Sequence, residues 1–368
     1  MNILPFAASF PNFRRITNLE QFVEDARENY HTFKHKLFLN ERTPGFFIYK
    51  IKTATRTHVG LIATLDINDY SDNRVKKHEN TLLAKEQQQG KLLIERKAIV
   101  KPILLTHKHD SALSMSIEFL IEDREPMYVV DFPIDKQEHT VWYIYEPDEL
   151  AMIESLYKTQ IEKVYIADGH HRLEASKWLN QWYEKDRKLP QHDAFLCALF
   201  SSKELEIKAY NRIVTMGEDF DKTTFLSQLS AFSDIKLLEK PKNPTRKTDI
   251  GLYIQGQYYM MTWKKETLNK VDKKLTILDV ALLNEHVFKN ILDIKNIKTD
   301  QRVKYADGQQ SLSNLIESCD KQPNSIGFAL YPVDLKDLMA VADTDGIMPP
   351  KSTWFEPRMR NGLLVQNL

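Results

Sequence analysis

The hydrophobic positions of this chain follow two periods that alternate along its length. Runs rich in β-branched and aromatic residues, which favour strands, occur at Gly45–Ile51 and Gly60–Asp66 and again at Lys163–Ala167 and Ala194–Phe200. Between these pairs, the polar stretch Thr81–Arg96 has the composition of a surface helix. The pattern therefore predicts strands and helices that are mixed throughout the chain.

The same pattern of hydrophobic and polar residues predicts further strands and helices before and after residue 210. We expect strands at Pro102–Leu105, Tyr128–Asp131, Ile207–Thr215 and Ile326–Tyr331, a hairpin at Leu252–Trp263, and helices at Leu278–Leu292 and Val333–Ala342. The fold class is thus α+β, with mixed sheets and short helices. A polar segment with two prolines, Glu239–Lys247, marks a linker. The expected domains are 1–146, 147–238 and 248–368.

One short loop lies where a predicted strand turns into a helix. Pro147 opens a helix before it, and the strand Lys163–Ala167 follows. Ala175, Trp178 and Trp182 then recur at helical spacing. The residues between strand and helix are Asp168-Gly169-His170-His171-Arg172.

Charge and cysteine content limit the classes of function. Lysine plus arginine total 51 and aspartate plus glutamate total 51, so the net charge is zero. A protein that coats nucleic acid or an anionic membrane usually has a basic excess, so we expect neither partner. Cys197 and Cys319 have no metal-binding spacing, and no apolar run reaches ~18 residues. We expect a cytoplasmic protein of unknown oligomeric state.

The Asp168–Arg172 loop has the chemistry of a phosphate site. Glycine at such a turn lets the backbone approach a ligand, and the following helix directs unpaired N–H groups toward the loop. Imidazole and guanidinium donors suit phosphate oxygens, so Gly169, His171 and Arg172 are the expected phosphate-binding residues. Asp168 and His170 are candidate catalytic residues. Glu174 lies in the first helical turn and is a further candidate.

Two other segments carry similar chemistry. In Lys77-His78-Glu79, a glutamate beside a histidine can act as a general base or a metal ligand, although an exposed loop is the commoner fate. The sequence Met348-Pro349-Pro350-Lys351-Ser352-Thr353 offers one ammonium and two hydroxyls as a second anion cradle, or simply a turn before a strand.

These three segments resemble one family in the same order. The string Tyr165–Ala175 (YIADGHHRLEA) is similar to the central motif of domain-of-unknown-function family 1015 (DUF1015), and the segments around His78 and Lys351 agree with its flanking motifs. The resemblance covers nearly the whole chain. It departs at Asn211, where the family pattern has histidine, while Arg212 matches. We expect the three motifs to converge on one site.

The loop is also similar to that of the ParB/sulfiredoxin superfamily, which implies a core of that type and a nucleotide or phosphate ligand. Sulfiredoxins have cysteine at the position of His170, so that activity is not expected. The free-serine kinases of the superfamily have a loop very similar to Asp168–Arg172. This resemblance implies phosphoryl chemistry on a small hydroxylated metabolite, with serine or phosphoserine as the leading substrate.

Two hypotheses follow. In the first, the protein is a phosphotransferase or phosphatase in which Asp168, His170 and Glu79 are catalytic and Lys351, Ser352 and Thr353 bind a second anionic group. Mg²⁺ and a nucleotide are the implied cofactors, because oxygen ligands predominate; the sequence assigns no metal ligands. In the second, the loop belongs to a non-catalytic nucleotide-binding switch of the ParB type, with a partner surface in place of an acceptor pocket.

Overall fold

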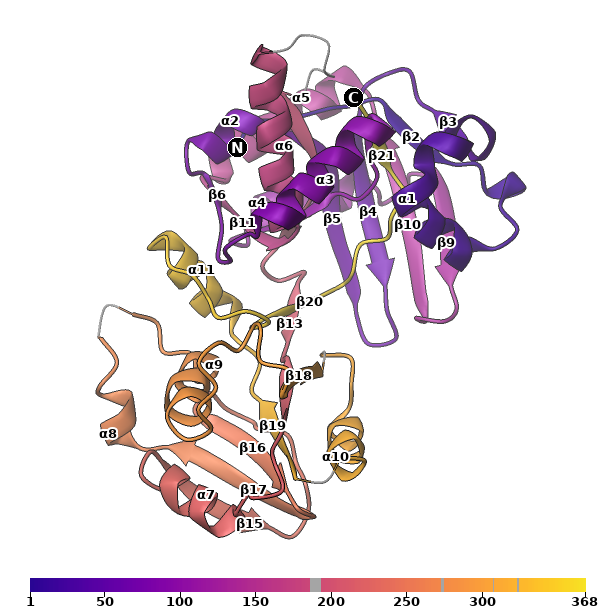
Figure 1. Ribbon diagram of the computed structural model, residues 1–368. Helices are drawn as coiled ribbons and strands as arrows, with labels where there is room; N and C mark the ends of the chain where they lie inside the picture. Colours follow the sequence, from indigo (N-terminus) through magenta and orange to yellow (C-terminus); the bar gives the residue numbers. More distant parts are fainter. Residues whose placement is uncertain (186–192, 273–274, 307, 323) are drawn as a thin grey trace. The chain divides into compact units, whose positions relative to one another are not determined.

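The computed structural model describes residues 1–185, 193–272, 275–306, 308–322 and 324–368. The chain forms two compact units (Figure 1). Unit 1 comprises residues 1–206 together with the C-terminal residues 357–368, and unit 2 comprises residues 207–356. The boundary expected at residue 147 lies within unit 1, and the three-domain division stays a prediction.

Unit 1 is built on a nine-stranded mixed sheet in the order β6-β11-β8-β12-β5-β4-β10-β9, with β1 also paired to β5. The pairs β6–β11 and β8–β12 are parallel, and the other pairs of this sheet are antiparallel. Its strands are β1 (Ile3–Leu4), β4 (Phe46–Lys52), β5 (Thr57–Asp66), β6 (Val75–Lys76), β8 (Ile103–His107), β9 (Tyr128–Phe132), β10 (Gln137–Ile144), β11 (Val164–Asp168) and β12 (Ala194–Ser201).

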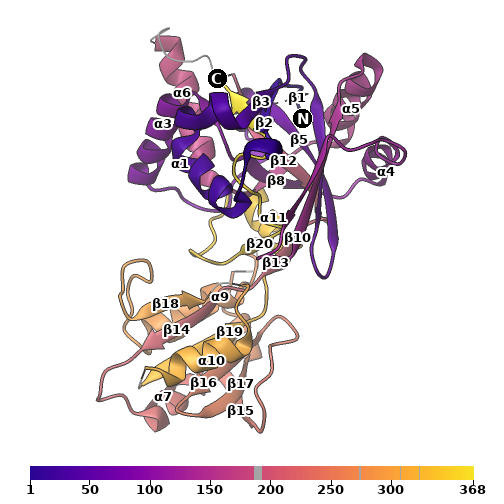
Figure 2. The same cartoon turned by 90° about the vertical axis from the view of Figure 1, so that its right-hand side faces the viewer.

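Helices cover both faces of this sheet. Figure 2 shows α1, α3 and α6 on one face and α4 and α5 on the other. This explains the nearly continuous apolar run of β12, because a strand covered on both faces has no solvent-facing positions. The helices are η1 (Phe13–Arg15), α1 (Leu19–Leu37), α2 (Ile67–Ser71), α3 (Leu83–Arg96), α4 (Ser111–Phe119), α5 (Pro147–Gln160) and α6 (His170–Lys185).

Two smaller sheets complete the strand pairing. The first joins segments from both ends of the chain in the order β3-β2-β21-β7, and the second pairs β13 with β20. Their strands are β2 (Ala8–Pro11), β3 (Phe38–Asn40), β7 (Ala98–Ile99), β13 (Glu206–Lys208), β20 (Trp354–Glu356) and β21 (Val365–Asn367).

Unit 2 contains a six-stranded antiparallel sheet in the order β15-β17-β16-β19-β14-β18. Its strands are β14 (Asn211–Thr215), β15 (Ser233–Leu238), β16 (Asp249–Ile254), β17 (Gln257–Trp263), β18 (Val303–Ala306) and β19 (Ser325–Leu330). Its helices are α7 (Lys222–Leu229), α8 (Lys265–Leu268), α9 (Asp279–Leu282), the π-helical segment η2 (Leu283–Lys289), α10 (Leu312–Asp320) and α11 (Leu335–Asp343).

Adjacent residues of β19 show how this sheet is covered on both faces. A Cβ on Gly327 would lie 2.9 Å from the sulfur of Cys319 in α10, so a side chain here would collide with that helix. The ring of Phe328 packs edge-on against Phe288 of η2, with centroids 5.3 Å apart. Because neighbouring strand residues point to opposite faces, α10 and η2 cover opposite sides of the sheet.

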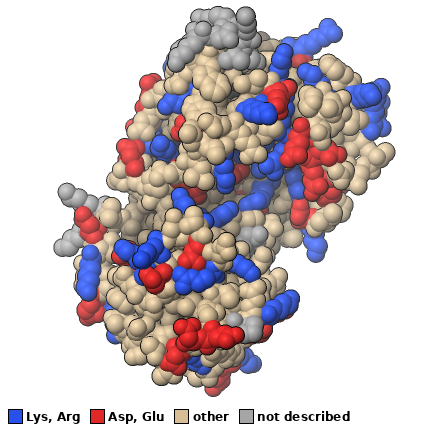
Figure 3. All heavy atoms as spheres, viewed as in Figure 1, with Lys and Arg blue, Asp and Glu red and all other residues tan. Residues whose placement is uncertain are grey.

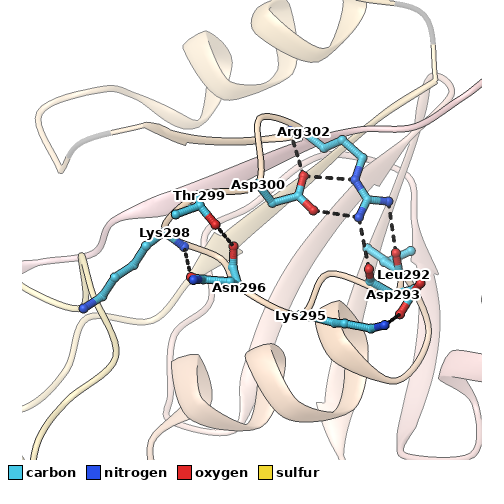
Figure 4. Close-up of polar contacts among 8 residues, drawn as sticks. All are labelled: Leu292, Asp293, Lys295, Asn296, Lys298, Thr299, Asp300 and Arg302. Atoms are coloured by element: carbon cyan, nitrogen blue, oxygen red, sulfur yellow. Dashed lines mark hydrogen bonds and ion pairs between the residues drawn. The ribbon is translucent and has the colours of Figure 1, made fainter.

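The loop from η2 to β18 is held by one arginine (Figure 4). The guanidinium of Arg302 forms two bonds with the Asp300 carboxylate, at 3.0 and 2.7 Å, and donates to the carbonyl oxygens of Leu292 and Asp293. Such a bidentate pair orders a loop that lacks its own secondary structure. This role is structural.

The α+β class expected from the sequence is confirmed. Predicted strands at Gly45–Ile51 and Gly60–Asp66 correspond to β4 and β5, and the strand-to-helix turn after Ala167 corresponds to β11 and α6. The single helix expected over Leu278–Leu292 is wrong in detail, because it divides into α9 and the wider π-helical turn η2.

The packing of Phe328 gives a stability prediction. Phe328→Ala should lower the free energy of unfolding by ~3–5 kcal/mol, since it removes a fully buried ring and leaves a cavity. The matched control is Phe119→Ala, because Phe119 is 75% exposed. Urea denaturation of both variants checks this. A loss for Phe328→Ala as small as that for Phe119→Ala would contradict the assigned core.

Candidate anion-binding site in unit 1

The turn between β11 and α6 depends on Gly169. Its φ of +112° lies where residues with a side chain are strained. A Cβ at this position would also lie 2.7 Å from the Nη2 atom of Arg172, so the arginine can fold back across the turn only because none is present. The Gly169 carbonyl accepts from the Leu173 amide at 3.0 Å, which is the first hydrogen bond of the helix.

This geometry gives the helix an open N-terminus. Because the bond from Leu173 to Gly169 is the first, the amides of His170, His171 and Arg172 have no acceptor within the helix. They lie at the positive end of the helix dipole. Amides and dipole together give this turn the geometry of an anion site, and the binding of an anion there stays a prediction.

Three cations gather at the same turn. Arg172 Nη2 lies 3.0 Å and Lys101 Nζ lies 3.6 Å from Asp168 Oδ2. Arg358 is the third charge close enough to act on Asp168 and Lys101. Among the described residues, nothing accepts a hydrogen bond from the buried Nε of Arg172. The turn therefore has more hydrogen-bond donors than the Asp168 carboxylate accepts from.

The charges have opposite effects on the two ionisable groups between them. The crowded surroundings of Asp168 would raise its pKa, although 56% of its side chain is exposed, but Arg172, Lys101 and Arg358 outweigh this effect and hold the pKa well below its usual range. Burial, reinforced by the charge of Arg172, lowers the pKa of Lys101 to about 8. At neutral pH Asp168 is thus a carboxylate and Lys101 is largely protonated.

His78 and Glu79 join the loop through His170. The rings of His78 and His170 meet edge to face, 4.6 Å apart, and both are almost fully buried. Burial lowers the pKa of His78 to about 4, and burial together with His78 lowers the pKa of His170 well below its usual value. Both imidazoles are therefore neutral at pH 7.

The neutral His170 ring has a defined orientation. Its Nε2 atom accepts a long hydrogen bond of 3.4 Å from the His78 amide, so its proton lies on Nδ1. Nδ1 lies 4.0 Å from Glu79 Oε2, which is too far for a hydrogen bond, and the neutral ring forms no ion pair with this carboxylate. A carboxylate from one motif is thus placed beside the imidazole of another.

His171 and Glu174 have structural partners. His171 Nε2 accepts from the amide of Leu82, the residue that precedes α3, at 3.1 Å and so ties the start of that helix to α6. Glu174 accepts a short hydrogen bond from Tyr70, whose pKa is raised by burial and by this carboxylate. These two hydrogen bonds join His171 to Leu82 and Glu174 to Tyr70, and neither bond involves Asp168.

The motif with Lys351, Ser352 and Thr353 belongs to unit 2. Lys351 has a φ of +55°, and its ammonium lies over the Tyr210 ring and 3.5 Å from the Tyr210 hydroxyl. Ser352 donates to the Pro349 carbonyl at 2.5 Å, and Thr353 is half-buried. The expectation that this motif meets the Asp168–Arg172 loop stays a prediction.

Arg212 positions this motif from inside unit 2. Its guanidinium is fully buried and donates to the carbonyl oxygens of Tyr210, Pro350 and Lys351. Burial lowers its pKa to about 10, so it remains charged. The neighbouring Asn211 accepts from the Leu330 amide at 2.9 Å and joins β14 to β19.

Within the described part of the chain, no group of three or more His, Cys, Asp or Glu side chains is placed to hold a metal ion. The described helices also include none that is long and apolar enough to cross a membrane. On the face shown in Figure 3, acidic and basic side chains are interspersed. That face therefore has no extended field of one sign.

A family model for proteins of unknown function, DUF1015, matches residues 9–281. The chain belongs to the DUF1015 family. This match includes the Asp168–Arg172 loop with His78, Glu79, Lys101 and Arg212, and it ends before Lys351. No curated protein sequence matches the chain.

Three solved structures show remote likeness to this DUF1015 member. C-terminally truncated SbnI from Staphylococcus aureus is 11% identical, with 83% of this chain and 87% of that chain covered and a TM-score of 0.45. A free serine kinase in complex with AMP is 11% identical, with 80% and 86% covered and a TM-score of 0.38. A conserved hypothetical protein from Pyrococcus furiosus is 10% identical, with 83% and 95% covered and a TM-score of 0.38.

The bond from Leu82 to His171 gives a prediction about stability rather than ligand binding. His171→Ala should lower the free energy of unfolding by ~0.5–1.5 kcal/mol, because the start of α3 loses its hydrogen bond to α6. The control His31→Ala changes an exposed histidine of α1. Chemical denaturation measures both. Equal stability of the two variants would show that this hydrogen bond does not stabilise the start of α3.

Proposed function

We propose that this protein binds a phosphorylated small molecule at the Asp168–Arg172 turn and catalyses phosphoryl transfer or phosphoester hydrolysis there. One observation carries the proposal: Lys101, Arg172 and Arg358 gather around a helix N-terminus whose first amides have no intrahelical acceptor. Phosphate is the ligand chemistry that best fits several charge-assisted donors and oriented amides.

Each cation has a distinct part in holding phosphate. The Nε and amide donors of Arg172 face the ligand, while its Nη2 atom remains on Asp168. Lys101 and Arg358 neutralise the remaining charge. His171 keeps Nε2 on Leu82, so it donates to the ligand only through its protonated Nδ1.

Asp168 acts by orienting the cations. Its lowered pKa makes it a poor proton acceptor at neutral pH, since a good general base has a pKa near the working pH. It also supplies a carboxylate oxygen for a Mg²⁺ ion that arrives with the phosphates, which is how proteins usually bind this metal. We propose Mg²⁺ and a nucleotide as the cofactors on this basis.

Glu79 is the general base of the proposal, and His170 positions it. The hydroxyl oxygen of the acceptor attacks phosphorus, its proton passes to Glu79, and the leaving phosphate oxygen takes the bonding electron pair. With water as the acceptor, the same steps give hydrolysis. The neutral Nδ1–H of His170 would orient the carboxylate without neutralising it once the two close from 4.0 Å to hydrogen-bond distance in the complex with substrate.

Serine or phosphoserine is the leading substrate. In this proposal, Lys351 and Thr353 bind its second anionic group, Ser352 shapes their loop by donating to the Pro349 carbonyl, and Arg212 holds the loop in place. We also propose that residues 147–238 form a ParB/sulfiredoxin-like core. His170 stands where sulfiredoxin chemistry would need a thiol, so sulfiredoxin activity is not part of the proposal.

One observation favours the non-catalytic switch as a second candidate. Leu82 and Leu83 begin α3 beside His171, and they are 48% and 62% exposed. Exposed leucines next to a ligand loop suit a partner surface whose shape depends on the ligand. A switch would bind nucleotide tightly and turn over no substrate.

Replacement of Arg172 tests phosphate binding. Arg172→Ala should weaken binding of pyrophosphate or a nucleoside diphosphate at least ~10-fold, because it removes charge-assisted hydrogen bonds. The control Arg42→Ala removes an exposed charge from the same unit. Calorimetric titration measures the affinities.

The same titration has a defined pH dependence. The affinity of wild type should fall as pH rises through about 8, since Lys101 then loses its proton. In Lys101→Met, which lacks that group, this fall should be absent. If the Arg172→Ala variant is folded and binds pyrophosphate or the nucleoside diphosphate with wild-type affinity, the phosphate site is refuted.

Replacement of Glu79 tests the reaction. Glu79→Gln should bind the nucleotide with affinity close to wild type and lose at least ~100-fold in kcat, because the amide cannot accept the proton. The control Glu24→Gln alters an exposed acid of α1. Phosphate transfer or release is followed with serine or phosphoserine, nucleoside di- and triphosphates and Mg²⁺. Tight nucleotide binding without turnover by wild type would favour the switch.

A further inference from the structure

Unit 2 has a pocket of its own, lined by both charged and apolar side chains. Its walls come from the start of α9, the end of β19, the segment before β16 and the loop around Ser352. The charged residues of this lining are Lys247, Asp279 and Asp337, and its apolar residues include Leu278, Leu330 and Val333.

Asp279 is the unusual group of this pocket. Only 7% of the residue is exposed, and both carboxylate oxygens accept from the same amide, that of Thr248, at 3.1 and 3.0 Å. Thr248 has a φ of +80°, a strained conformation for a β-branched residue. The fold thus holds an amide against a buried carboxylate that has further lone pairs to share.

The neighbouring lysine is engaged elsewhere. Lys247 Nζ lies 2.7 Å from Asp337 and is also close enough to act on Asp279, so one ammonium serves a pocket with two carboxylates. Burial raises the pKa of Asp279 to about 6 despite Lys247, and the nearby Asp249 adds to this rise. A second positive charge would therefore stabilise the pocket, because a buried carboxylate that shares its counter-ion is costly.

Ser352, a further polar residue of the lining, also favours a ligand that donates hydrogen bonds. The Ser352 hydroxyl gives its proton to the Pro349 carbonyl, so toward the pocket its oxygen can only accept. An ammonium group has three donors and no acceptor, and its methylene stem would pack against the leucine and valine side chains. A carboxylate or phosphate would instead face Asp279.

We propose that this pocket binds the ammonium group of a small primary amine, with the carboxylate of Asp279 as its counter-ion. The proposal rests on unit 2 alone and holds whether or not unit 1 binds phosphate. Its ligand class is an aliphatic amine with a short apolar stem. An amino-bearing metabolite is one member of this class.

The test uses the full chain and two probes of equal size. Ethylammonium chloride should shift the Thr248 amide resonance saturably, whereas ethanol, its uncharged isostere, should not. Asp279→Asn should bind ethylammonium at least ~30-fold more weakly, as expected when one partner of a buried charge pair is removed. The exposed Asp234→Asn should match wild type.

Two further measurements distinguish loss of the ammonium site from misfolding of a variant. Affinity of wild type should fall as pH falls through about 6, since Asp279 is then protonated. Lys247→Met should tighten binding, because it removes the competing cation, and this opposite effect cannot arise from misfolding. Wild-type affinity in Asp279→Asn, an equal response to potassium chloride, or no binding of ethylammonium would overturn the proposal.

Discussion

The contact between Arg172 and Gly169 is the constraint on which the unit 1 site depends. A glycine at positive φ leaves space for the guanidinium to fold back over the turn, where a Cβ would lie 2.7 Å from its Nη2 atom. Arg172 then reaches Asp168, and Asp168 in turn holds Lys101 at 3.6 Å. Gly169 thus determines where α6 begins, which amides lack an intrahelical acceptor, and where Arg172 and Lys101 lie.

In the proposed mechanism, the carboxylate that holds cations is separate from the carboxylate that accepts a proton. Asp168 lies among cations and stays ionised, so it orients them. Glu79 lies instead beside a buried, neutral imidazole, whose remaining proton faces it. Asp168 and Glu79 therefore have different electrostatic environments, which is the usual basis for different roles of two carboxylates.

Local pattern predicted much of this fold and part of this site. The turn from β11 to α6 followed from an apolar run, a glycine and helical spacing, all within 20 residues. Lys101 was missed because it reaches the turn only through sheet order: it precedes β8, which pairs with β11. Arg358 was missed because it lies far from the loop along the chain, in the C-terminal segment that belongs to unit 1. Sequence spacing alone contains no such information.

Residue type alone did not show structural bonds to partners that are distant in sequence. His171 and Glu174 have the chemistry of ligand-binding groups, which stays a prediction, and their observed bonds go to Leu82 and Tyr70. Those partners lie 89 and 104 residues away along the chain. Asn211 likewise has a structural bond, to Leu330, which accounts for a polar residue inside β14.

The central claim is that the first amides of α6 and the cations around them form a phosphate site. Its most direct test is an amide NMR titration of the full chain with pyrophosphate. The account predicts that the largest shifts occur at Gly169, His170, His171 and Arg172, saturate together and give one affinity. Saturable pyrophosphate binding that leaves these four amides unchanged, with its shifts elsewhere, would contradict it.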